Sequence, residues 1–148
     1  MRYSHPMTAD RFLFILLRIN AGVLLLAAPC ALLPFAWMDA IHRDVLGLDS
    51  LPDIPITKYM ARSLSLVYAL HGAVILVVTL DLERYRPLVP ILALLHIGFG
   101  CAMLAVDMSA GLPWWWTAVE GPSLVGFGLL VFAVYHRTRR ASRGTSGV

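Results

Sequence analysis

Two histidines stand inside long apolar segments of this chain, where an imidazole could do chemistry. His71 lies ten residues before Asp81, and His96 lies ten residues after Arg86, on either side of one short polar connection. If both segments are antiparallel helices, a rise of about 1.5 Å per residue places both rings about 15 Å from the same membrane edge. Such a pair could ligate a b-type haem or a metal, or relay a proton. The plainer interpretation is that each ring forms hydrogen bonds that hold helices together.

A second candidate site consists of two charged residues in apolar surroundings. Glu120 follows a cluster of tryptophans in the last apolar segment, and Arg62 lies near the start of the second. Because a charge is costly in a low dielectric unless it is paired, we expect Arg62 and Glu120 to form an ion pair near the external surface. Gly121-Pro122 follows directly and should free backbone carbonyls there. The alternative to a structural ion pair is a polar binding site that also includes Tyr59 or Asp107.

Other chemistry has no counterpart in the sequence. The chain contains no nucleotide-binding glycine loop, no zinc-protease motif and no nucleophile elbow. Its two cysteines, Cys30 and Cys101, lie in apolar segments without the spacing of metal ligands. We therefore predict no catalytic residue and no metal site, and an enzyme is the less favoured class.

Four apolar segments, each long enough to cross a membrane, position these residues. A span needs roughly 20 predominantly apolar residues. The chain is 59% hydrophobic and only 14% charged, with a mean hydropathy of +0.74, which excludes a soluble domain. We predict an all-α integral membrane four-helix bundle with an up-down antiparallel arrangement. It forms a single domain over residues 1–148, with a flexible tail over 136–148, and its helices cover residues 12–36, 59–80, 87–106 and 113–135.

The first external connection is the longest one and has an amphipathic beginning. Trp37, Ile41 and Val45 recur every four residues, which predicts a short helix lying in the membrane interface. Gly47 is a plausible end for this helix. At the start of the last span, Trp114–Trp116 is typical of an interfacial aromatic belt.

The basic residues indicate how the chain is oriented. Eight Lys and Arg residues lie in the N-terminal segment, the 81–86 connection and the C-terminal tail, against three on the other side. The positive-inside rule then places both termini in the cytoplasm of a multi-pass inner-membrane protein. The net charge of +3 is spread over loops and tails, so no nucleic-acid partner is expected.

Small residues recur along three of the segments and predict faces of close helix contact. Ala61, Ser65, Ala69 and Ala73 repeat every four residues in the second segment. Ala93, His96 and Gly100 share a face in the third, and Gly121, Gly126 and Gly128 serve the fourth. Packing inside one bundle is the favoured use, and the same faces could serve a homo-oligomer or a larger membrane complex.

Several short motifs resemble a known group of proteins. They are Leu17–Leu25, Tyr59–Ser63, Asp81–Val89, Gly111–Trp116 and Glu120–Pro122. Together with the size and the four spans, they are similar to small four-helix bacterial membrane proteins of the DoxX-like type. The resemblance implies a four-helix membrane fold and, for some members, partnership with redox enzymes. It supplies no site residues, and the long first external loop departs from the compact DoxX pattern.

Three functions follow as hypotheses. The first is a structural or accessory subunit that packs with itself or with a partner complex. The second is a redox or haem-binding subunit that uses His71 and His96. The third is a small-solute transporter with an outer polar site at Arg62 and Glu120.

Overall fold

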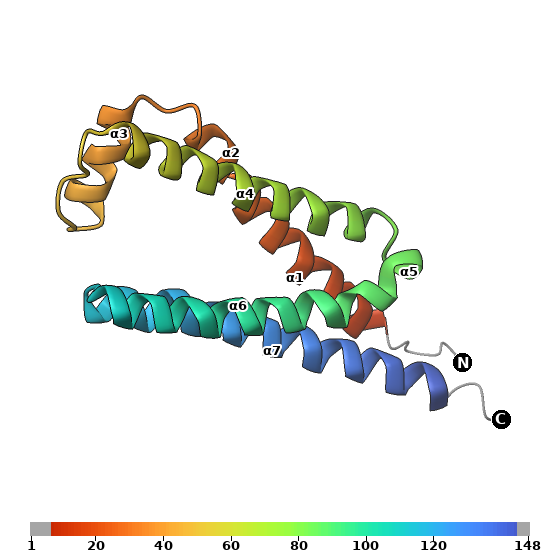
Figure 1. Ribbon diagram of the computed structural model, residues 1–148. Coiled ribbons are helices and arrows are strands. Elements are labelled where there is room, and N and C mark those ends of the chain that lie inside the picture. The colour runs from red at the N-terminus through yellow and green to blue at the C-terminus, as the bar shows by residue number, and fades with distance from the viewer. Residues whose placement is uncertain (1–6, 145–148) are drawn as a thin grey trace. The chain divides into compact units, whose positions relative to one another are not determined.

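The computed structural model describes residues 7–144, and the side chains of residues 9–140. All regular secondary structure in this part of the chain is helical, which confirms the predicted all-α fold. The helices are α1 (Met7–Leu25), α2 (Ala27–Cys30), α3 (Phe35–Ala40), the π-helical turn η1 (Ile41–Val45), α4 (Pro55–Leu80), α5 (Leu82–Tyr85), the 3-10 turn η2 (Arg86–Leu88), α6 (Val89–Ala110) and α7 (Trp114–Gly144) (Figure 1).

Four helical segments are long and apolar enough to cross a membrane, as predicted. They cover Ala9–Cys30, Pro55–Leu80, Leu82–Ala110 and Trp114–Arg140. The second begins four residues before the predicted start at residue 59, because Pro55 is suited to the first turn of a helix. The protein is therefore a multi-pass membrane protein that contacts the lipid bilayer.

The first span is shorter at its C-terminal end than the sequence pattern predicted. It was expected to reach residue 36, but helical structure ends at Cys30. Pro29 has no N–H to continue the hydrogen-bond ladder, and Pro34 takes an extended conformation with φ −54° and ψ 140°. The apolar composition continues past both prolines, whereas the helix does not.

A short helix follows in the first connection, as predicted. It consists of α3 and η1, and it ends where Gly47 adopts a positive φ of 64° that favours glycine. Trp37, Ile41 and Val45 are 62%, 45% and 75% exposed, so no other part of the chain covers their common face. An exposed apolar face of this kind suits the membrane interface.

The tail is more ordered than expected, because α7 continues past His136 to Gly144. The Arg86 guanidinium Nη2 donates a hydrogen bond to the Thr138 hydroxyl at 2.7 Å and lies 2.8 Å from the Asp10 carboxylate. These contacts join the ends of α1 and α7 to η2. The remaining part of the predicted tail, residues 145–148, lies outside the described residues.

The chain divides into two compact units, which are described separately. One contains residues 7–17 and 78–144, and the other contains residues 18–77. In the first unit, α6 and α7 lie side by side, from green-cyan to blue in Figure 1.

Glycines bring α6 and α7 into close antiparallel contact. A Cβ built at Gly100 would lie 2.7 Å from the Gly121 carbonyl oxygen, and one at Gly128 would lie 2.7 Å from the Ala93 carbonyl oxygen. Real Cβ atoms do not approach backbone oxygens this closely, so both positions require glycine. The expected small-residue packing is thus found at Ala93, Gly100, Gly121 and Gly128, whereas a Cβ at Gly126 would meet nothing within 4 Å.

The second unit uses the same device between α1 and α4. A Cβ built at Gly72 would lie 2.9 Å from the Ala21 carbonyl oxygen and 2.9 Å from the Leu24 Cβ. Ala69, one turn earlier, is buried as the predicted stripe requires. The closest approach therefore occurs at Gly72, next to the stripe that the sequence indicated.

Candidate functional site

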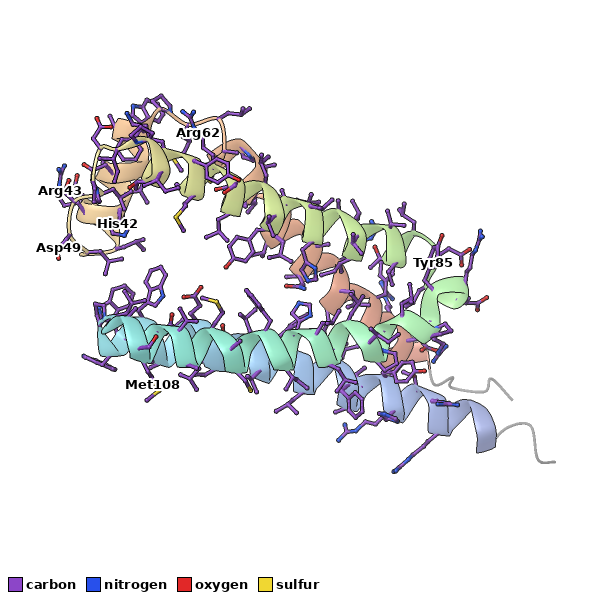
Figure 2. The ribbon with its side chains drawn as sticks, in the orientation of Figure 1. His42, Arg43, Asp49, Arg62, Tyr85 and Met108 are labelled. Carbon is purple, nitrogen blue, oxygen red and sulfur yellow. The ribbon has the colours of Figure 1, made fainter. Side chains whose placement is uncertain are left out.

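Arg62 lies on the exposed side of α4, in a groove near the start of the second span (Figure 2). The groove has a volume of about 490 Å³ and is lined by Pro55, Lys58, Tyr59, Arg62, Ser63 and Leu66. These residues recur at helical spacing along one face of α4. The structure therefore places two cations and two hydroxyl groups in a shallow groove at one end of a span.

Glu120 has a neighbour that sequence reasoning missed. The Trp116 indole Nε1–H donates a hydrogen bond to Glu120 Oε2 within the first part of α7. The two residues are four apart, so the spacing that places them on one helix face was visible in the sequence. The predicted loosening at Gly121-Pro122 does not interrupt α7, and the Ser123 hydroxyl donates to the Glu120 carbonyl oxygen at 3.0 Å.

The predicted pairing of Arg62 with Glu120 remains a prediction. Arg62 belongs to the unit of residues 18–77, and Glu120 belongs to the other unit. Each residue is suited to its predicted role separately, since one is an exposed guanidinium and the other a partly buried carboxylate.

His96 is buried in α6, with 5% of its surface exposed. Its Nδ1 lies 2.8 Å from the Leu92 carbonyl oxygen one turn earlier, and its ring centroid lies 5.2 Å from that of Phe127. Because a carbonyl can only accept, Nδ1 carries the proton in this contact. A backbone carbonyl that accepts from one ring nitrogen is the usual support of a metal-ligating histidine, and it also supports a purely structural one.

His71 lies on α4 with intermediate exposure. It belongs to the unit of residues 18–77, whereas His96 belongs to the other. Whether the two imidazoles face each other, as haem ligation by both would require, therefore stays a prediction.

Asp107 is the most unusual polar residue in the first unit. It is 1% exposed, and its Oδ2 has no hydrogen-bond partner among the residues that the structure describes. Contacts of Ala93 with Gly128 and of Gly100 with Gly121 set the register of the two helices, and the same step brings Asp107 level with Trp114. The sequence analysis placed Asp107 at the edge of a polar site. Its position on the Ala93–Gly100 face was the signal for burial.

The first external connection is held together by polar contacts. Asp39 Oδ1 accepts hydrogen bonds from the Leu51 backbone N–H at 2.7 Å and the Ser50 hydroxyl at 2.9 Å. These two donors, in that order, hold the pKa of Asp39 below its ordinary value of 3.8. Figure 2 shows His42, Arg43 and Asp49 in the same region, where His42 Nδ1 lies 2.7 Å from the Asp49 carbonyl oxygen.

Arg43 completes this network from the end of the short helix. Its Nε donates to Asp44 Oδ1 at 2.8 Å, and its Nη1 lies 3.5 Å from Asp39 Oδ2. The hydrogen bond raises the pKa of Arg43 and lowers the pKa of Asp44. The connection is thus a defined structure, and its charges are mutually compensated.

No metal centre can be assembled from the residues that the structure describes, since no three His, Cys, Asp or Glu side chains among them come together. Comparison of the chain with models of protein families, with curated proteins and with solved structures gives no match. The resemblance to DoxX-like proteins therefore rests on the short motifs alone. What the sequence and structure establish together is a small protein with four membrane spans.

Proposed function

We propose that this protein is a non-catalytic accessory subunit that associates within the membrane, through an exposed face of α6, with itself or with a partner complex. The observation that carries the proposal is that α6 has two small-residue faces on opposite sides. One face, with Ala93 and Gly100, packs against α7. The other is exposed.

The exposed face consists of Gly98, Ala102, Ala105 and Ser109. All four are exposed, and a Cβ at Gly98 would meet nothing within 4 Å. At about 100° per residue these positions lie within one narrow stripe, opposite the face that contacts α7. The Ser109 hydroxyl donates to the Val106 carbonyl oxygen at 2.8 Å, so its polar group is already satisfied.

This face supports association because small residues gain little from contact with lipid. Burial of apolar groups drives no helix contact in a bilayer, so helices associate where their backbones can approach closely. The α6·α7 pair shows that this chain forms such contacts where small residues meet. A second helix could approach the exposed stripe in the same way.

Site-specific photo-crosslinking in native membranes tests the proposal. A photoreactive amino acid at Ala102 is expected to form a covalent adduct with a polypeptide, identified by mass spectrometry as a second copy or another protein. The matched control places the same group at Leu129, which is also exposed but has no small-residue stripe around it. Adducts with lipid alone at both positions would contradict the proposal.

The geometry of His96 supports a second candidate, a haem-binding subunit. Its Nδ1–H is held by the Leu92 carbonyl oxygen, which fixes the ring in the manner of haem and metal ligands. We expect a Soret absorption band in the protein purified from its own membranes if this function holds, and its loss in both His96→Ala and His71→Ala. A protein without visible absorption excludes this candidate while leaving the accessory function intact.

The class of partner and the membrane follow from the sequence as part of the same proposal. The DoxX-like motifs favour a redox enzyme as partner, and the distribution of basic residues favours an inner membrane with both termini in the cytoplasm. Identification of the Ala102 adduct tests the first of these directly.

A further inference from the structure

The groove at the start of α4 carries more binding capacity than a structural role requires. Arg62 is exposed, and within residues 18–77 no acceptor binds its guanidinium. The Tyr59 side chain is also exposed, and its hydroxyl has no partner in that unit. Both groups border the same groove of about 490 Å³.

Lys58 and Ser63 add to this capacity but are already partly engaged. The Lys58 ammonium forms an ion pair with Asp53 and lies 5.2 Å from the centre of the Phe35 ring. The Ser63 hydroxyl donates to the Met60 carbonyl oxygen at 3.2 Å, which leaves its oxygen able to accept. Arg62 is therefore the cation of the groove that has no counter-charge in its unit.

The groove changes from polar to apolar along α4. Pro55 and Lys58 stand at its outer end, Arg62 and Ser63 follow, and Leu66 lies deepest in the span. A ligand that fits this gradient has an anionic head and an apolar tail. A guanidinium presents paired N–H donors that match the oxygens of a phosphate.

We propose that this groove binds the headgroup of an anionic phospholipid, with the phosphate at Arg62 and Tyr59 and the acyl chain along Leu66. Lipid is the favoured source of the phosphate because the groove begins at the edge of a membrane span, where lipid phosphates are concentrated. The contact orders a lipid on α4 and defines the depth of this helix in the bilayer. It takes Arg62 as a lipid ligand, in place of an ion pair with Glu120.

Native mass spectrometry of the purified full chain with added lipids tests the proposal. We expect phosphatidylglycerol to bind with higher affinity than phosphatidylcholine. Arg62→Gln should weaken phosphatidylglycerol binding about fivefold, since one basic residue near a membrane surface contributes about that factor. Arg62→Lys should retain part of the affinity. The matched control is Arg137→Gln, which removes an equally exposed Arg outside the groove and should change the affinity less than about twofold.

Further arms separate the alternatives, and each can overturn the proposal. Equal losses in Arg62→Gln and Arg137→Gln would show nonspecific attraction of lipid to positive charge. Displacement of lipid by inorganic phosphate at equal concentration would show a site for free phosphate. Glu120→Gln should leave the lipid affinity unchanged, and a clear increase would show that Glu120 holds Arg62. Circular dichroism of each variant verifies that the helices are intact.

Discussion

Asp107 is the residue whose environment is hardest to reconcile with its chemistry. A carboxylate oxygen that is buried without a partner costs free energy, because water no longer solvates it. Membrane proteins retain such groups where they interact with something outside the isolated chain, or at a cost in stability.

We predict that removing this carboxylate stabilises the isolated protein. Asp107→Leu keeps a similar size and eliminates the unpaired oxygen, so the free energy of unfolding should rise by about 1–3 kcal/mol. Unfolding in mixed micelles of a mild detergent and sodium dodecyl sulfate measures the change. A loss of stability would mean that the carboxylate has a partner in the folded protein.

Asp39 supports a prediction about pH in the first external connection. Its pKa is lower in the folded protein than the ordinary 3.8, so its ionised form stabilises the connection. This contribution is complete above pH 3.8 and is lost as the pH falls through the lowered pKa. The Leu51 amide should report the transition, because its N–H donates to this carboxylate.

Nuclear magnetic resonance of the Leu51 amide is the measurement. In Asp39→Asn the amide should lose its acid transition and exchange faster with water at neutral pH. Asp49→Asn is the control, because His42 contacts the Asp49 backbone carbonyl, which this change retains. A Leu51 signal that is insensitive to Asp39→Asn would disprove the contact.

Sequence reasoning at this scale identified candidates more easily than contacts. Arg62, Glu120, His71 and His96 were selected because polar groups in apolar segments need an explanation. The hydrogen bond from Trp116 to Glu120 was accessible from the spacing of four residues. The contact from Leu51 to Asp39 was not, because it depends on how an irregular segment folds back.

At the scale of elements, the glycines of α6 and α7 make the clearest prediction. Gly100→Ala and Gly121→Ala place a Cβ within 2.9 Å of a backbone oxygen on the other helix, which forces the helices apart. We expect each to lower the free energy of unfolding by about 1–3 kcal/mol.

Gly126→Ala is the matched control on the same helix. Its Cβ enters open space, so the change should be neutral or stabilise α7 by up to about 1 kcal/mol through helix propensity. The same micelle unfolding assay compares the three variants. Equal effects at Gly100 and Gly126 would show that the helices do not pack as described.

The elements show why composition predicts spans better than their ends. Apolar content alone located four spans, because any helix in lipid needs it. The first span ends at Cys30 because of Pro29 and Pro34, although the apolar run continues. Gly126 resembled Gly121 and Gly128 in the sequence, and only the helix register separates them.

At the scale of the whole molecule, the positive-inside rule predicts a topology. In a chain with Cys30 and Cys101 replaced by Ser, a membrane-impermeant maleimide should label Asp49→Cys in intact cells. It should label Arg84→Cys only after the membrane is permeabilised. Both positions are exposed, so accessibility within the protein does not differ. The reverse pattern would invert the topology.

The central claim is that the exposed face of α6 joins this protein to another polypeptide in the membrane. The most direct test is the mass of the assembly extracted with its native lipids, measured by native mass spectrometry. We predict a mass above the 16.3 kDa of one chain by at least one further polypeptide. Gly98→Leu, which adds bulk to that face, should reduce the mass to a single chain. A wild-type protein that carries only lipids would contradict the claim.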